Sequence, residues 1–416
     1  MSKVLWITAV LAFIGGLLFG YATANIAGGL LFLKSEFNLS LFQQGALVSI
    51  LLLGALLGAM IGGIVADNLG RKRTLLITAL LFLLSGLFLF LAGSLLALLM
   101  GRFLLGIAVG ISSLLIPLYV SEMSPPNHRG AIVALSQLGI TVGILLAYLA
   151  ALLFSQTSNW RALFGMIMPF ALVEFCLLFF LPETQAFRKF SREKKQQQPT
   201  WKILFTNPYR RILLIGVMIS LFQQITGINA IIYYAPQIFR SAGFQSDRSA
   251  LLATIGIGSI NVLATIFSLY LIDRAGRRRL LLIGLAGMVF SLLFMVFTFI
   301  SSFEITAIIS MISLMIYIVS FAISLGPVTW VLISEIFPLN IRGRAMGIAT
   351  FVNWFSNFVI AFSFLSLIKY LHEGGTFLLF AIIGTLGYIY VYYKVPETKN
   401  KSLEEIEMGW KKRGEL

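Results

Sequence analysis

Neutral amide side chains inside long apolar stretches are the residues of this chain whose chemistry stands out. Polar groups are costly in such stretches, so they tend to mark a ligand path. An amide carries hydrogen-bond donors and acceptors, so it pairs with a hydroxyl group in either sense. A set of amides therefore suits a neutral ligand that bears several hydroxyl groups. The candidates are Gln137, Gln223, Gln224, Asn229, Asn261, Asn353 and Asn357.

Spacing and a nearby aromatic residue fit the same kind of ligand. Asn353 and Asn357 are four residues apart and so share one helix face. Trp330 follows Pro327 by three residues and offers an apolar ring face together with an indole N–H. The alternative is that the amides only join helices, a common use worth about 0.6 kcal/mol per pair. The residue types alone leave both interpretations open.

The elements that carry these residues must cross a membrane, because the composition excludes a soluble globular protein. Of the 416 residues, 59% are hydrophobic and 11% are charged, and the mean hydropathy is +0.94. Soluble domains are typically about 45–50% apolar. At about 20 apolar residues per spanning helix, the chain has room for roughly a dozen spans.

The apolar runs fall into two groups of six and predict an all-α membrane protein with twelve transmembrane helices. We expect an N-terminal half (1–181), a cytoplasmic linker with room for short helices (182–211), a C-terminal half (212–394) and a cytoplasmic tail (395–416). The first run is too long for a signal peptide and is interpreted as an uncleaved helix. The runs are Trp6–Phe32, Gln44–Ala66, Thr74–Ala92, Leu95–Tyr119, Ala131–Leu153, Trp160–Leu181, Ile212–Phe239, Ser249–Ile272, Leu280–Phe299, Thr306–Ile333, Ala345–Leu367 and Thr376–Tyr393.

The distribution of basic residues predicts the orientation in the membrane. Twenty-five of the 31 Lys and Arg residues fall in the termini and in loops on one side. Cytoplasmic loops are enriched in such residues, so both termini are expected in the cytoplasm of a cell with a plasma or bacterial inner membrane. The net charge of +15 is then explained largely by the 25 basic residues that face the cytoplasm. The lipid bilayer is an expected partner, and no nucleic-acid partner is expected.

Three loop motifs occur twice at matching places in the two groups of spans. The sequence D-N-L-G-R-K-R starts at Asp67 and D-R-A-G-R-R-R at Asp273, while S-E-x-x-P-x-N-x-R-G starts at Ser121 and Ser334. The triplet P-E-T starts at Pro182 and, in the second half, at residue 396. The pairs predict two parallel six-helix halves related by a pseudo-two-fold axis.

The charges of these motifs predict a cytoplasmic gate. Opposite charges at helix ends can bridge neighbouring helices, and breaking the bridges would give a second conformer. The alternative is a static loop with solvated charges, but the duplication favours a gate. The gate residues are Asp67, Arg71, Glu122, Arg129, Asp273, Arg277, Glu335 and Arg342.

An enzyme is disfavoured by the distribution of the reactive residue types. Cys176 is the single cysteine and lies in an apolar run, so it offers neither a disulfide nor a cysteine-based metal site. The two histidines, His128 and His372, fall in separate loops on opposite sides of the predicted membrane. We expect no cofactor and no bound metal.

Taken together, the motifs closely resemble the sugar porter family of the major facilitator superfamily, over nearly the whole chain. The resemblance implies an alternating-access carrier of a monosaccharide, a hexose or pentose such as glucose, galactose or xylose. The motifs are G-G-L-L-F-G-Y (from Gly15), D-N-L-G-R-K-R, G-R-F-L-L-G (from Gly101), P-L-Y-V-S-E-M-S-P (from Pro117), Q-Q-I-T-G-I-N-A-I-I-Y-Y-A-P (from Gln223), G-P-V-T-W (from Gly326), N-W-F-S-N (from Asn353) and V-P-E-T.

The resemblance also implies roles for individual residues. Gln137, Gln223, Gln224, Asn229, Trp330 and Asn357 match sugar-binding positions of the family, and Asn261 and Asn353 match less closely. Gly227 and the pair Gly326-Pro327 are expected to interrupt helices at the site. Tyr233 and Tyr234 match an external lid, with aromatic residues at the membrane interface as the alternative.

The coupling of transport to protons is the open part of the prediction. Proton-coupled members of the family have an aspartate at the position of Ala22, near the arginine that corresponds to Arg102. Without that acid we expect facilitative transport, as in the mammalian glucose carriers. An engineered replacement would give the same sequence. Glu174, the acid well inside a predicted span, is about 12 Å from the cytoplasmic end, so a helix-end partner is favoured over proton transport.

Three other function classes are alternatives to facilitative sugar transport. They are a sugar-proton symporter, in which Ala22 is an engineered replacement of the aspartate or Glu174 provides the coupling, a transporter-like nutrient sensor, and a proton-driven drug exporter. A short tail argues against the sensor, and the amide set argues against the exporter. A monomer is expected to be the functional unit, and the identity of the sugar stays open.

Overall fold

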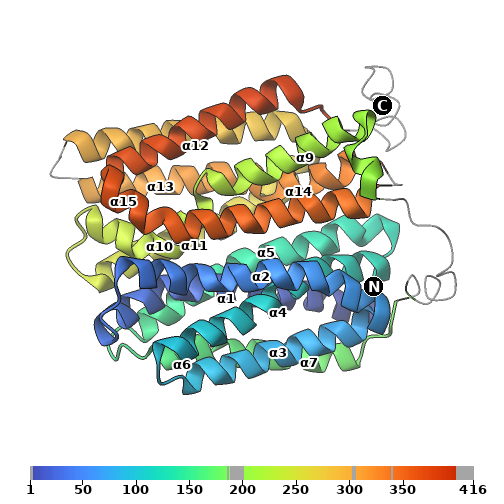
Figure 1. Ribbon diagram of the computed structural model, residues 1–416, viewed down its shortest axis with the longest axis horizontal. Coiled ribbons are helices and arrows are strands. Elements are labelled where there is room, and N and C mark those ends of the chain that lie inside the picture. Colours follow the sequence, from blue (N-terminus) through green and yellow to red (C-terminus); the bar gives the residue numbers. More distant parts are fainter. Residues whose placement is uncertain (1–2, 185–186, 188–200, 302–305, 339–340, 400–416) are drawn as a thin grey trace. The chain divides into compact units, whose positions relative to one another are not determined.

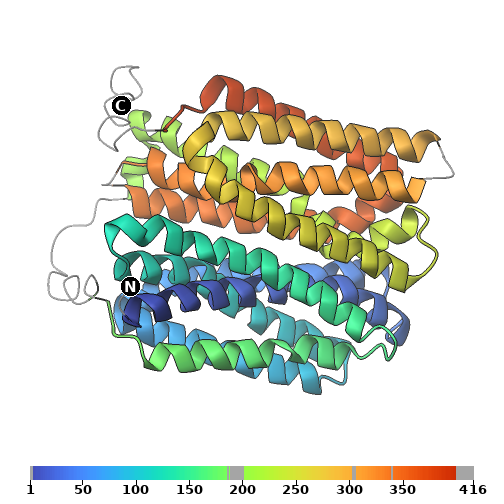
Figure 2. The ribbon, with the colours of Figure 1, turned by 180° about the vertical axis from the view of Figure 1, so that it is seen from behind.

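The computed structural model describes residues 3–184, 187, 201–301, 306–338 and 341–399. The side chains of residues 126–129, 201, 202, 207, 208, 273 and 301 lie outside this description. The described chain is helical and contains no strand (Figures 1 and 2). Its elements are α1 (Lys3–Glu36), α2 (Leu41–Leu69), α3 (Arg71–Leu91), α4 (Leu95–Met123), α5 (Pro126–Leu153), α6 (Trp160–Gly165), α7 (Ile167–Phe179), the 3₁₀ helix η1 (Trp201–Phe205), α9 (Asn207–Ile225), α10 (Ile228–Ser241), α11 (Asp247–Ala275), α12 (Arg277–Ser301), α13 (Thr306–Ala322), α14 (Leu325–Ile336) and α15 (Arg342–Lys394).

Eleven helical stretches of the described chain are long and apolar enough to cross a membrane. Three of them are interrupted helices, which consist of α6 with α7, α9 with α10, and α13 with α14. The last stretch, α15, contains two of the predicted spans. They are separated at His372, where the backbone is not helical (φ 58°, ψ 175°) and the chain turns back (Figure 1). The predicted all-α membrane fold with twelve spans is confirmed.

Contacts between Cα atoms divide the chain into two compact units. Unit 1 comprises residues 1–195, 230–262 and 361–366, and unit 2 comprises residues 196–229, 263–360 and 367–416. Helix α10, the first part of α11 and a short stretch of α15 therefore pack in unit 1, although they follow the linker in the sequence. The chain passes from unit 2 to unit 1 between Asn229 and Ala230, in the first turn of α10.

Close helix packing in unit 1 depends on glycine. A Cβ atom on Gly16 or Gly20 of α1 would overlap the carbonyl oxygen of Ser136 or Ile140 on α5. Small residues four apart let backbones approach in this way, which stabilises helix pairs in membranes. Glycines at the same spacing bring α2 and α4 together, namely Gly54, Gly58, Gly106 and Gly110.

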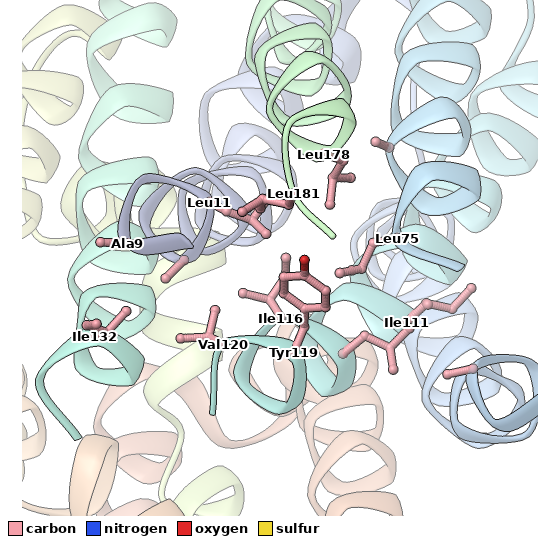
Figure 3. Packing of buried hydrophobic residues seen from close by; sticks show 14 of the residues in the cluster. Ala9, Leu11, Leu75, Ile111, Ile116, Tyr119, Val120, Ile132, Leu178 and Leu181 are labelled. Carbon is pink, nitrogen blue, oxygen red and sulfur yellow. The ribbon is translucent and has the colours of Figure 1, made fainter. Parts of the chain in front are cut away.

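A buried apolar cluster in unit 1 joins α1, α2, α3, α4, α5 and α7 (Figure 3). The ring of Tyr119 lies in this cluster with Leu75, Leu178 and Leu181. Its hydroxyl group donates a hydrogen bond of 2.6 Å to the carbonyl oxygen of Pro182. The cluster therefore fixes the P-E-T triplet beside the first turn of α3.

We expect Gly20→Ala to destabilise the protein by at least about 1–3 kcal/mol, since the added methyl group forces α1 away from α5. The matched control is Gly347→Ala, because no atom lies within 4 Å of a Cβ at this helical glycine. Alanine there should be neutral or stabilising by up to about 1 kcal/mol. Thermal unfolding in detergent measures both, and equal melting temperatures would contradict the proposed role of the close packing.

Candidate functional site

Four of the predicted amides form one continuous hydrogen-bonded network inside unit 2. Asn229 Nδ2 donates to Gln224 Oε1 at 2.7 Å. Gln224 Nε2 then donates to Asn353 Oδ1 at 3.0 Å, and Asn353 Nδ2 donates to Gln223 Oε1 at 2.6 Å. The network thus joins α9, α10 and α15 through side chains that the sequence analysis selected one by one.

Backbone carbonyl groups anchor this network at one end. Gln223 Nε2 donates to the carbonyl oxygens of Leu325 and Gly326 in α14, at 2.8 and 3.2 Å. Asn353 Nδ2 also donates to the carbonyl oxygen of Ser220 at 3.1 Å. Both N–H groups of Gln223 and of Asn353 are therefore engaged, and both side chains are buried.

The other end of the network is the part that offers polar groups to a ligand. Asn229 is half-buried, and the network uses its Nδ2 group, which donates to Gln224. The two interpretations of the amides therefore apply to different residues. Gln223 and Asn353 join helices, whereas a role of Asn229 and Gln224 in binding a hydroxyl group stays a prediction.

The interruption between α9 and α10 lies at the predicted glycine. Gly227 has φ 96°, a conformation that glycine adopts without strain. Tyr317 donates a hydrogen bond of 2.9 Å to the carbonyl oxygen of Thr226. At the interruption this buried carbonyl needs a hydrogen-bond donor from outside its own helix. Asn229 therefore lies in the first turn of α10, next to a break at which the carbonyl group of Thr226 is hydrogen-bonded.

The second interruption differs in place from the prediction. The helix breaks at Ser324 (φ −129°, ψ −100°), and α14 starts at Leu325. Gly326 and Pro327 therefore lie in the first turn of α14 rather than at a break. Proline is tolerated there because the first N–H groups of a helix have no partner within it.

The remaining predicted ligand residues are distributed over both units. Trp330 of α14 and Asn357 of α15 belong to unit 2, and 37% of the Trp330 side chain surface is exposed. Gln137 of α5 and Asn261 of α11 belong to unit 1. The structure thus joins four members of the predicted set by hydrogen bonds, and a common site for all eight stays a prediction.

The predicted external lid residues lie in α10 within unit 1. Tyr233 and Tyr234 are both buried, which does not fit exposed interfacial aromatics. Tyr234 donates to the carbonyl oxygen of Ala361 at 2.8 Å, and its ring stacks on Phe364 with 5.0 Å between centroids. Tyr234 is thus held in place by the 361–366 stretch of α15. Its role as a lid stays a prediction.

The predicted coupling arginine has neutral partners. Arg102 is 1% exposed, and its Nε atom donates to the carbonyl oxygen of Leu47 at 2.7 Å. Its Nη1 atom donates to Asn25 Oδ1 at 3.3 Å. Ion pairs within 4.0 Å join other residues of the described chain but not Arg102.

Asn25 was missed by the sequence analysis. It lies three residues after Ala22 and so shares its face of α1. An amide one turn after the position of the missing acid was the available signal. The structure places a neutral acceptor next to Arg102 instead of a carboxylate.

The prediction of a helix-end partner for Glu174 is wrong. The side chain is fully buried in α7, and neither carboxyl oxygen accepts or donates a hydrogen bond in the part of the chain that the structure describes. The error arises because depth along a helix does not tell which way a side chain points. Here it points into packed helices.

Five of the eight predicted gate residues form ion pairs, and their role as a gate stays a prediction. Arg71 Nη1 lies 2.7 Å from Asp67 Oδ1, and Arg71 Nε lies 3.6 Å from Glu122 Oε1. In unit 2, Arg277 Nη2 lies 3.0 Å from Glu335 Oε1. Each pair with a glutamate bridges two helices, as predicted.

The other three gate residues are Arg342, Arg129 and Asp273. Arg342 donates to the carbonyl oxygen of Phe337 at 3.1 Å and to no carboxylate that the structure describes. The sequence could not show this, because a motif does not tell whether a carbonyl oxygen or a carboxylate lies within reach of a guanidinium group. The side chains of Arg129 and Asp273 lie outside the described residues.

The glutamates of the two P-E-T triplets cap helices, a role that the sequence analysis did not assign. Glu183 Oε1 accepts from the backbone N–H groups of Arg71 and Lys72 at 3.0 and 3.2 Å. Glu397 accepts from those of Arg277 and Arg278 at 2.9 and 3.2 Å. A carboxylate is favourable at a helix N-terminus. The repeat of P-E-T was the signal that could have revealed the role.

Comparison with known proteins agrees with the fold. The chain matches the model of the sugar (and other) transporter family over residues 8–192 and 185–410. It is 36% identical to the glucose transporter GlcP of Staphylococcus epidermidis, over 97% of this chain and 97% of that protein. It is 37% identical to the galactose-proton symporter of Escherichia coli K12, over 98% and 94%.

The fold is similar to that of the xylose transporter XylE from E. coli in an inward open conformation. The TM-score is 0.83 at 30% identity, and the match covers 98% of this chain and 100% of that chain. The protein is thus a multi-pass membrane transporter and not an enzyme. It belongs to the sugar porter family of the major facilitator superfamily.

We expect Glu397→Ala to destabilise the protein by about 0.5–2 kcal/mol, because α12 loses the acceptor for two N–H groups. The control is Asp247→Ala, which removes an exposed surface ion pair with Arg240 and should cost less than about 1 kcal/mol. Chemical unfolding in detergent compares the two. An equal loss for both variants would show that the cap does not stabilise the helix.

Proposed function

We propose that this protein carries a monosaccharide across the membrane by alternating access, and that the amide network of unit 2 forms part of the sugar site. The observation that carries the proposal is the network itself, which is neutral, anchored on backbone carbonyls and open at Asn229. The names of relatives that transport glucose or galactose support a hexose, and the similarity to a xylose transporter keeps a pentose open.

The geometry suggests how the network would hold a sugar. Gln224 cannot rotate its amide freely, because Asn353 takes its N–H and Asn229 donates to its oxygen. Asn229 therefore presents its oxygen and its second N–H to sugar hydroxyl groups. Trp330, with part of its ring exposed, would stack on the apolar face of the sugar. Neutral partners bind without creating a deep charge well, so release stays fast.

Alternating access assigns roles to the two sequence halves, 1–181 and 212–394. The bridges of Arg71 with Glu122 and of Arg277 with Glu335 would stabilise one conformer at the cytoplasmic side and weaken in the other. The buried tyrosines of α10 would act at the external side. In this scheme both termini are cytoplasmic, and one monomer carries out the whole cycle.

Facilitative transport is the mode that the surroundings of Arg102 favour. Its partner is the amide of Asn25, and Ala22 provides no group that takes up a proton. The second candidate is proton symport, which one relative performs by name. The observation in its favour is Glu174, an acid that is fully buried without a hydrogen-bond partner in the described chain.

Uptake of labelled glucose, galactose and xylose into proteoliposomes tests the transport function. We expect saturable uptake of at least one sugar, and Asn229→Ala should weaken its binding about 3- to 10-fold through the loss of one or two hydrogen bonds. The control is Gln156→Ala in an exposed loop, which should behave as the parent protein. Lack of uptake of every sugar, or full affinity in Asn229→Ala, would overturn the proposal.

Proton coupling is tested by the pH change outside the vesicles during sugar uptake. We expect no alkalinisation for the parent chain or for Glu174→Gln, because Arg102 has no carboxylate partner that titrates. Ala22→Asp should produce sugar-dependent alkalinisation, since it places an acid on the Arg102 side of α1. Alkalinisation in the parent that disappears in Glu174→Gln would instead establish symport through Glu174.

A further inference from the structure

A hydrogen bond joins α5 to α10 within unit 1. The hydroxyl group of Tyr148 donates to the backbone carbonyl oxygen of Ile232 at 2.9 Å, and both residues are buried. In sequence, α5 precedes the linker and α10 follows it. The bond therefore connects helices that the repeat pattern assigns to different halves, although both belong to one compact unit.

The carbonyl group of Ile232 is free to accept this bond because of a proline. In an α-helix, a carbonyl oxygen accepts from the N–H group four residues later. That position is Pro236, which lies inside α10 and has no N–H group. Water is absent at membrane depth, so an unpaired carbonyl there is costly. Tyr148 supplies the donor that the helix itself lacks.

The ring of Tyr148 is seated against a second helix as well. A Cβ atom on Gly258 of α11 would lie 3.0 Å from Tyr148 Cδ2, so only glycine leaves room for the ring without displacement. The tyrosine is thus held between α10 and the first part of α11. These are the segments that follow the linker in sequence but pack in unit 1.

Helix α10 is connected to unit 2 through the chain at Gly227, where the backbone has φ 96°. The preceding helix, α9, belongs to unit 2. Helix α10 is therefore attached at its start to one unit by covalent bonds and further along to the other unit by Tyr148. A break at Gly227 permits α10 to change direction relative to α9.

We propose that the hydrogen bond from Tyr148 to the proline-freed carbonyl of Ile232 is a latch that fastens α10 to unit 1 in this conformer. The bond breaks when α10 leaves unit 1 during the transport cycle. Tyr148 is accordingly a positioning residue that sets the balance between the two conformers. The inference rests on the alternating-access part of the proposed function, but it concerns a contact outside the sugar site.

The test measures the release of α10 without sugar, so its outcome does not depend on whether the sugar assignment holds. A cysteine replaces Ala235, which is fully buried on α10, in a Cys176→Ser background, and its reaction with a membrane-impermeant maleimide is timed. We expect Tyr148→Phe to increase the labelling rate about 3- to 10-fold, as for the loss of one hydrogen bond. An unchanged rate would overturn the proposal.

A second variant tests the role of the proline. Pro236→Ala restores an N–H group at position 236, so the carbonyl of Ile232 is satisfied within α10 even when Tyr148 is absent. The increase caused by Tyr148→Phe should therefore shrink to less than about 2-fold in the Pro236→Ala background. An equal increase in both backgrounds would overturn the link between the latch and Pro236.

The matched control is Tyr21→Phe. Tyr21 is also a buried tyrosine whose hydroxyl group donates to a backbone carbonyl, that of Leu163 at 2.6 Å. This bond joins α1 to α6 and does not involve α10, so its loss should leave labelling at position 235 unchanged. A similar increase for Tyr21→Phe would mean that general loosening, and not the latch, controls access, and would count against the proposal.

Discussion

The need to pair every backbone polar group in the absence of water governs this structure. A continuous helix meets that need by itself, but a carrier that binds a ligand requires helices with interruptions. Each interruption leaves carbonyl groups that some side chain must satisfy. Tyr317 serves the carbonyl of Thr226 at the break after α9, and Gln223 bonds carbonyls at the start of α14. The polar residues of the site are thus fixed by the backbone whose bonds they complete.

Helix ends at the predicted cytoplasmic side are stabilised by the same principle with charged groups. Glu183 and Glu397 each accept from the first N–H groups of a helix, in equivalent places of the two repeats. In unit 2 the adjacent Thr398 also donates to Glu335 at 2.6 Å, which ties the cap to the bridge with Arg277. In each repeat, the P-E-T glutamate caps a helix whose first arginine pairs with the glutamate of the S-E motif. The duplicated motifs thus connect three chain segments in the same way in both repeats.

Hydropathy alone was enough to predict the twelve spans, because about 20 apolar residues have few folds open to them in lipid. Residue chemistry also identified the amides, since polar side chains at membrane depth are energetically costly and tend to mark a ligand path. It could not identify their partners, which depend on the helix packing that brings Asn353 to Gln224. For the same reason the neutral partner of Arg102 was missed, and Glu174 was assigned a partner that it does not have.

The direction of the hydrogen bonds along the amide network is decided at its far end. The carbonyls of Leu325 and Gly326 only accept, so Gln223 must turn its nitrogen toward them and its oxygen toward Asn353. Asn353, Gln224 and Asn229 are then oriented in the same sense, because each donates through its nitrogen to the oxygen of the amide before it in the network. A ligand that required the reverse orientation would have to invert four side chains together. If the network binds sugar as proposed, selectivity for the handedness and position of a hydroxyl group would follow from an oriented chain of dipoles, several residues away from the atoms that the ligand touches.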